Sequence, residues 1–161
     1  MASLFERLRD GAAAEWAAYV RHPFVEGIAR GDLPEAAFRR YLTQDYLFLI
    51  HFARAYALAV VKADDLAGMR SAQATLNALL DHEMSLHVDY CATWGISAAE
   101  LEGLEAAPET LAYTSYVLER GFSGDVLDLK VALAPCVVGY RDIAAAIQAR
   151  PDFRREGNRY L

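Results

Sequence analysis

Apolar residues recur every three to four positions along almost the whole chain, and no stretch alternates in the manner of a β-strand. This periodicity predicts amphipathic α-helices throughout. Long helices with short connections predict an all-α bundle. The expected helices cover residues 3–20, 32–63 and 64–94, a short segment from Ser97, residues 108–121, and a last long helix from Gly124.

Prolines and glycines mark where these helices break. The segment His22-Pro23-Phe24 is expected to interrupt the chain after the first helix, because a residue before proline avoids helical backbone angles. Gly95 provides a left-handed stop for the third helix. Pro135 lies inside the last long helix and is expected to kink it, because proline has no backbone N–H.

The length of 161 residues fits a single helical domain, residues 1–161, with an apolar core. Lys and Arg number 16 against 22 Asp and Glu, which makes the net charge −6. The adjacent arginines at 39–40 and at 154–155 are isolated pairs and form no basic patch. Nucleic acid is therefore not an expected partner.

Features of secreted and membrane proteins are absent from the sequence. No charged start followed by an apolar core opens the chain, and apolar runs such as 55–61 and 131–138 are too short to span a bilayer. Cys91 and Cys136 show no CxxC spacing and cannot make a disulfide framework. We expect a cytoplasmic protein that does not bind membranes.

An acidic residue interrupts an aromatic stripe on the second helix. Asp45, Phe48 and Phe52 share one helical face, and Tyr41 extends it by one turn. A carboxylate on such a face is costly to bury unless it is paired. Asp45 either pairs with a core arginine or caps a neighbouring helix, or it binds a flat, nitrogen-rich ring between aromatic walls.

Cys136 follows Pro135 and precedes Tyr140 by one helical turn. A lone buried cysteine is usually a small apolar side chain, whereas a reactive thiol needs neighbours that stabilise its thiolate. Both interpretations stay open on spacing alone. Cys91 has no comparable setting and is expected in the core.

Glu83 and His87 lie four residues apart and could face a metal together. A di-iron site of the ferritin type instead needs Glu-x-x-His twice, and no second copy follows. We therefore expect a hydrogen bond from Glu83 or His87 to a neighbouring helix, and no metal. Tyr113 could line a pocket and donate a hydrogen bond.

Together these segments resemble the TenA (thiaminase II) family, whose fold is similar to that of haem oxygenase. The resemblance is collinear from about residue 15 to residue 148. The matching segments are His22-Pro23-Phe24-Val25, Gly31-Asp32-Leu33-Pro34, Tyr41-Leu42-Thr43-Gln44-Asp45-Tyr46, Phe52-Ala53-Arg54, Lys62-Ala63-Asp64, Glu83-Met84-Ser85-Leu86-His87, Leu111-Ala112-Tyr113-Thr114, Pro135-Cys136 and Gly139-Tyr140.

The resemblance implies hydrolysis of 4-amino-5-aminomethyl-2-methylpyrimidine, and of thiamin in some members, without metal or cofactor. It implies that Cys136 is the nucleophile, as in the cysteine-bearing branch, and that Asp45 hydrogen-bonds the ring nitrogen and amino group. Tyr113 and Tyr140 would orient the ring and support the thiol. The residues expected to line the substrate site are Asp45, Phe48, Phe52, Tyr113, Tyr140 and Tyr160.

Two departures from the family pattern stand out. Phe48 occupies a position where the family often has a tyrosine that helps to activate the thiol. The family's C-terminal helices, which carry an acid glutamate, are not expected within these 161 residues. Relatives are commonly tetrameric, so the resemblance also implies a homotetramer.

Two other classes of function compete with the hydrolase. One is a non-catalytic, ligand-binding member that regulates transcription indirectly, since the chain is acidic and shows no helix-turn-helix pattern. The other is a metal-dependent enzyme on the same scaffold, using Glu83 and His87. Ammonia release and metal analysis distinguish the three.

Overall fold

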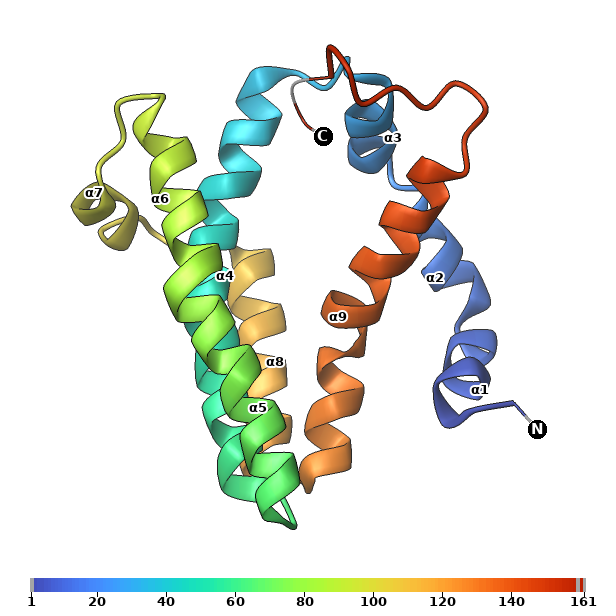
Figure 1. The fold of residues 1–161 in the computed structure, drawn as a ribbon, viewed down its shortest axis with the longest axis vertical. Helices are drawn as coiled ribbons and strands as arrows, with labels where there is room; N and C mark the ends of the chain where they lie inside the picture. Colours follow the sequence, from blue (N-terminus) through green and yellow to red (C-terminus); the bar gives the residue numbers. More distant parts are fainter. Residues whose placement is uncertain (1, 159, 161) are drawn as a thin grey trace. The chain divides into compact units, whose positions relative to one another are not determined.

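The computed structural model describes residues 2–158 and 160, and within them every regular element is helical (Figure 1). The prediction of an all-α fold is confirmed. In chain order the elements are α1 (Leu4–Gly11), α2 (Ala13–Val20), α3 (Pro23–Arg30), α4 (Glu35–Lys62), α5 (Leu66–Ala78), the π-helical segment η1 (Leu79–Glu83), α6 (Met84–Ala92), α7 (Ala98–Glu102), α8 (Pro108–Ser123) and α9 (Val126–Gln148).

The first predicted helix is two helices. Ala12 leaves helical geometry with φ −122° and ψ 35°, next to Gly11, whose backbone is costly to hold in a helix. The break predicted at His22 is present, but Pro23 also begins α3, which we did not predict. His22 caps α3 by accepting a hydrogen bond from the Phe24 N–H, and Pro23 sits at the first helical position, where its missing N–H is harmless.

The third predicted helix, residues 64–94, contains a π-helical segment. Met84 donates its N–H to the carbonyl of Leu79, five residues back, where an α-helix would use the fourth. Asp65 caps the start of α5, and Gly95 after α6 has a φ of +75°, as predicted for the helix stop. Because the π turn holds one extra residue, every side chain of α6 is rotated around the helix axis from the position that an uninterrupted α-helix continuing α5 would give it.

The chain divides into two compact units, residues 1–37 with 134–161 and residues 38–133. One boundary falls within α9, beside Pro135, at the position where the sequence predicts a kink. Proline removes one hydrogen bond of the helical ladder there, although α9 continues as a single element through it.

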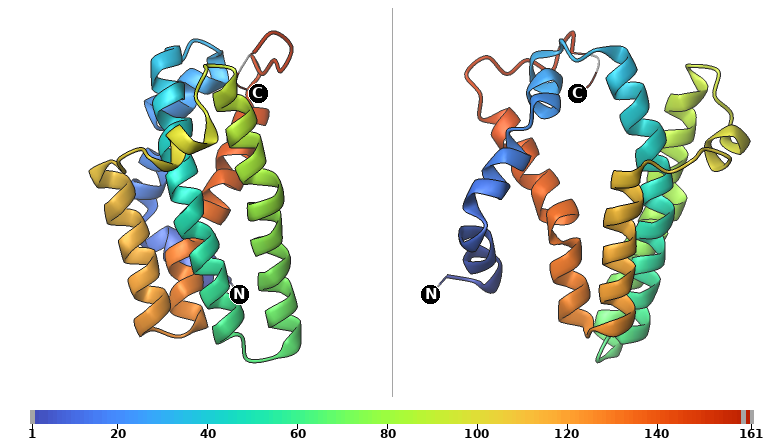
Figure 2. Two further views of the ribbon diagram at one scale, coloured as in Figure 1. Left: turned by 90° about the vertical axis from the view of Figure 1, so that its left-hand side faces the viewer. Right: turned by 180° about the vertical axis from the view of Figure 1, so that it is seen from behind.

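In the unit of residues 38–133, α4, the α5–α6 segment and α8 lie side by side (Figure 2). Gly121 of α8 marks a close approach: a Cβ atom there would lie 2.9 Å from Leu58 of α4 and 3.2 Å from Leu129 of α9. Side chains that are almost fully buried in this core include Leu49, Ala55, Leu79, Cys91, Leu101, Val117 and Leu129.

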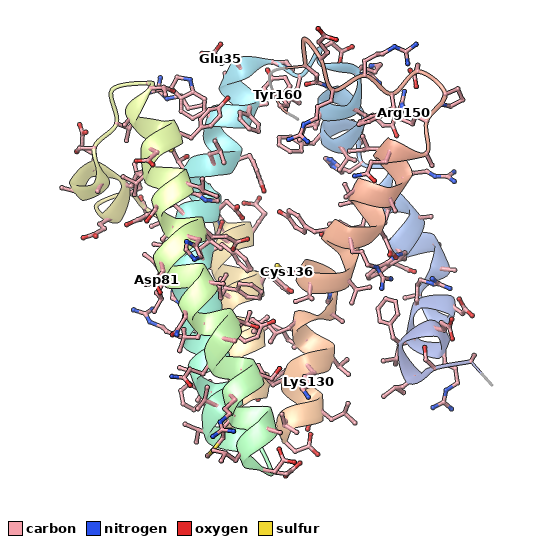
Figure 3. All side chains as sticks on the ribbon, viewed as in Figure 1. Glu35, Asp81, Lys130, Cys136, Arg150 and Tyr160 are labelled. Atoms are coloured by element: carbon pink, nitrogen blue, oxygen red, sulfur yellow. The ribbon has the colours of Figure 1, made fainter. Side chains whose placement is uncertain are left out.

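In the unit of residues 1–37 and 134–161, α2 packs against α9. The Trp16 indole donates a hydrogen bond to Asp142 at 3.2 Å, and the Tyr19 hydroxyl donates to the Pro135 carbonyl at 3.2 Å. Arg150, just beyond the end of α9 (Figure 3), pairs with Glu26 of α3 at 2.6 Å. These contacts join segments more than one hundred residues apart in the sequence.

The whole of helix α9 is long and apolar enough to cross a membrane, judged by length and composition alone. The apolar run 131–138 within it, which was considered by itself from the sequence, is too short. Core helices of globular proteins pass the same test, so one such helix is weak evidence for a membrane span. Asp142 within α9 accepts a hydrogen bond from Trp16 and pairs with Arg141 at 2.8 Å.

Gly139 of α9 offers a test of the packing of α2 against α9. A Cβ atom there would lie 2.3 Å from Cε1 of Tyr19, so Gly139→Ala forces the ring aside and should destabilise the protein by about 1–3 kcal/mol. The measurement is the free energy of unfolding in urea. Gly11→Ala is the matched control, because nothing lies within 4 Å of its Cβ position. Equal stability of the two variants would contradict the close contact.

Candidate active site

Asp45 of α4 is paired with His87 of α6. The distance from His87 Nε2 to Asp45 Oδ2 is 2.9 Å, and the Tyr41 hydroxyl donates to the same oxygen at 3.3 Å. The two paired side chains are only 14% and 16% exposed. The expected inter-helix hydrogen bond of His87 is confirmed. The partner of Asp45 is this histidine and not the core arginine that was one of the expectations.

The contacts of His87 define its protonation. Its Nδ1 lies 2.9 Å from the backbone carbonyl of Glu83, which can only accept, and its Nε2 faces a carboxylate. Burial lowers the pKa of His87, but the hydrogen bonds to Asp45 and to Glu83 outweigh it, so the pKa is raised above its ordinary value. With an acceptor facing each ring nitrogen, these surroundings favour the imidazolium form, in which both nitrogens donate.

Three aromatic rings form a stack beside Asp45. Phe48 lies parallel to Tyr113 of α8, with centroids 5.8 Å apart and an interplanar angle of 13°, and it stacks on Phe52 at 5.1 Å. The Tyr113 hydroxyl donates to the Ala132 carbonyl at 3.0 Å. Asp45, Phe48, Phe52 and Tyr113 therefore come together within one unit, as α4 and α8 pack side by side.

Gln44 positions α8, and sequence reasoning missed this role. Its Oε1 accepts hydrogen bonds from the Ala107 N–H at 2.7 Å and from the Thr110 hydroxyl at 3.0 Å, and its Nε2 donates to the Glu105 carbonyl at 3.2 Å. Gln44 therefore holds the first turn of α8, one turn before Tyr113. No local pattern pairs a glutamine with residues sixty positions away.

Cys136 and Tyr140 lie one turn apart on α9, in the other unit. Cys136 is partly exposed midway along the helix (Figure 3), and Tyr140 is 46% exposed. The carbonyl before Cys136, that of Pro135, accepts the hydrogen bond of Tyr19. That Cys136 and Asp45 line one cavity stays a prediction.

The remaining candidates have defined surroundings. The Tyr160 hydroxyl donates to the carbonyl of Leu33, between α3 and α4, within the unit that also holds Cys136. Cys91 is fully buried, and burial raises the pKa of its thiol, which confirms the core assignment. In residues 2–158 and 160, no three His, Cys, Asp or Glu side chains are grouped to hold a metal.

Known proteins match this chain along most of its length. Residues 10–160 match the TENA/THI-4/PQQC family. The aminopyrimidine aminohydrolase of Halalkalibacterium halodurans is 43% identical over 150 residues, which cover 93% of this chain and 65% of that protein. The aminopyrimidine aminohydrolase of Helicobacter pylori is 38% identical over 145 residues, which cover 90% of this chain and 67% of that protein.

A solved structure agrees with the fold. A TenA family transcription regulator from Silicibacter sp. TM1040 superposes with a TM-score of 0.88 at 50% sequence identity, covering 91% of this chain and 65% of that one. The chain thus spans slightly under two thirds of the length of the first of these relatives and of this structure. The haem-oxygenase-like, all-helical fold is confirmed, and the chain belongs to the TENA/THI-4/PQQC family.

Proposed function

We propose that this protein is an aminopyrimidine aminohydrolase of the thiaminase II type. It would hydrolyse 4-amino-5-aminomethyl-2-methylpyrimidine to the hydroxymethyl pyrimidine and ammonia, and thiamin would be a second substrate. The observation that carries the proposal is the carboxylate of Asp45 on the same face of α4 as Phe48 and Phe52, with Tyr113 of α8 stacked on Phe48. Relatives named as aminohydrolases, 38% and 43% identical, support it.

Asp45 suits an aminopyrimidine. Its Oδ2 already accepts from His87 and Tyr41, whereas Oδ1 accepts no hydrogen bond from the described part of the chain. An exocyclic amino group donates to such an oxygen, and a protonated ring nitrogen does so more strongly. Asp45 thereby draws positive charge to the ring and makes it a better electron sink.

Aromatic side chains would bind the faces of the ring. Phe48, Phe52 and Tyr113 offer apolar surfaces of the right shape for stacking. Phe48 has no hydroxyl, so it contributes a wall and no hydrogen bond. By the family resemblance, Tyr140 and Tyr160 are proposed as further substrate-binding residues.

Cys136 is proposed as the nucleophile. Its sulfur adds to the pyrimidine ring and forms a C–S bond, after which the aminomethyl C–N bond breaks and ammonia leaves with the electron pair and a proton. Water then supplies the hydroxyl group, and the C–S bond breaks to regenerate the thiol. A covalent adduct divides one difficult displacement into two easier steps. The sum is aminopyrimidine plus water to alcohol plus ammonia, which needs no redox partner, metal or cofactor.

The family resemblance supports two further proposals about the whole protein. We place the protein in the cytoplasm, since two of its relatives are bacterial proteins named as metabolic enzymes. We also propose that it assembles as a homotetramer.

The nucleophile is tested by a matched pair of cysteine variants. Cys136→Ala should lower the rate of ammonia release from the aminopyrimidine by at least about a hundredfold, because the covalent route is lost. Cys91→Ala should retain the rate, since Cys91 is fully buried in the core. The assay detects ammonia with an enzyme-coupled reaction, and circular dichroism confirms that both variants are folded.

Equal rates for Cys136→Ala and the wild type would reject the nucleophile. A wild-type protein that binds the pyrimidine and releases no ammonia would instead favour a ligand-binding, regulatory role. The structural relative described as a transcription regulator gives that second candidate its support.

Asp45 is tested by removing its charge. Asp45→Asn should weaken binding of the hydroxymethyl pyrimidine by roughly ten- to a hundredfold, as expected for loss of a charged hydrogen bond. Isothermal titration calorimetry measures the Kd. Asp81→Asn, at an exposed position on η1 (Figure 3), is the control and should bind as the wild type does. Unchanged binding by Asp45→Asn would place the pyrimidine elsewhere.

A further inference from the structure

The carboxylate of Asp45 is held from one side only. Two donors, His87 Nε2 and the Tyr41 hydroxyl, meet on Oδ2, at 2.9 and 3.3 Å. Both of these hydrogen bonds go to Oδ2, and none to Oδ1 is found within residues 2–158 and 160. Oδ1 is also not fully buried, because no fully buried side-chain oxygen in that part of the chain lacks a partner. When two donors fix one oxygen of a carboxylate, the second oxygen points in a defined direction and keeps lone pairs that can accept hydrogen bonds.

His87 is itself held in place. Its Nδ1 donates to the Glu83 carbonyl, one turn earlier on its own helix, so the ring cannot turn without losing one of its two hydrogen bonds. A histidine with one nitrogen anchored to a backbone carbonyl and the other on a carboxylate orients that carboxylate. The same arrangement orients ligand groups in many enzyme sites.

The π-helical segment η1 sets the direction of His87. Each added residue rotates the following side chains by about 100° around a helix axis, since an α-helix has 3.6 residues per turn. The extra residue in η1 lies just before α6 and therefore decides which α6 side chains face α4. Single π turns within α-helices are frequent at functional sites.

We propose that His87, set in register by η1 and assisted by Tyr41, is a positioning residue that presents Oδ1 of Asp45 to the aminopyrimidine ring. This inference rests on the proposed function, since Asp45 must be the group that binds the ring. His87 does not touch the substrate. Its role is to fix the carboxylate and to keep a positive charge behind it.

The positioning of Asp45 by His87 depends on pH, because the histidine can donate from both ring nitrogens only when it is protonated. The groups that face it are Asp45 and Tyr41 from α4 and Glu83 from its own segment. Its pKa is raised above the ordinary histidine value, so the imidazolium persists to higher pH than in a free histidine and loses its proton as the pH rises through the raised pKa. Above it, one of the two ring donors is lost and Asp45 is less firmly oriented. Ligand binding should therefore weaken toward alkaline pH.

The test measures the Kd of the hydroxymethyl pyrimidine by calorimetry, from about pH 6 to about pH 9, for the wild type and three variants. His87→Leu should weaken binding roughly tenfold or more at neutral pH. His87→Gln keeps a neutral N–H donor, so it should recover most of that loss and bind with little dependence on pH. His82→Gln is the matched control at an exposed histidine of η1 and should follow the wild type.

Two results would overturn the inference. One is a folded His87→Leu variant that binds the pyrimidine as tightly as the wild type. The other is a His87→Gln variant with the same pH profile as the wild type, since a merely structural hydrogen bond would give that outcome. Failure of the proposed function is distinct: the wild type itself would neither bind the pyrimidine nor release ammonia from the substrate.

Discussion

The pairing of Asp45 with His87 is the interaction on which the candidate site depends. Placing a carboxylate on an aromatic helix face is unfavourable, because a buried charge loses its hydration. His87 from α6 and the hydroxyl of Tyr41 offset that loss through hydrogen bonds to a single oxygen. The second oxygen keeps its capacity to accept, because the side chain of Asp45 is 16% exposed. A wholly structural ion pair would be expected to satisfy both oxygens.

Helix α4 organises the surroundings of that pair. Gln44, the residue before Asp45, ties down the first turn of α8, and this places Tyr113 against Phe48. Asp45 itself joins α4 to α6. Consecutive residues of one helix therefore fix two neighbouring helices by polar contacts, and the aromatic stack fills the space beside them. This is why a carboxylate and a flat apolar surface coincide in this unit.

The second unit is organised around α9. Pro135 interrupts the helical ladder, and the Tyr19 hydroxyl donates to the Pro135 carbonyl while its ring lies over Gly139. Any side chain at position 139 would displace that ring. The segment from Pro135 to Tyr140 is therefore explained by packing against α2 as well as by the proposed chemistry of Cys136. Packing of this segment is compatible with the chemistry proposed for Cys136.

Sequence by itself determined the helical class, most helix boundaries, the stripe that carries Asp45 and the core position of Cys91. It did so because helical periodicity and proline or glycine breaks are local properties of the backbone. Tertiary structure alone decided that His87 is the partner of Asp45, that Gln44 holds α8 and that Tyr19 covers Gly139. Those contacts join residues 42 to 120 positions apart. The π turn of η1 inserts one extra residue between α5 and α6, and the pattern of apolar residues in the sequence does not predict it. Side-chain pairing across helices depends on that register, which only the packed chain sets.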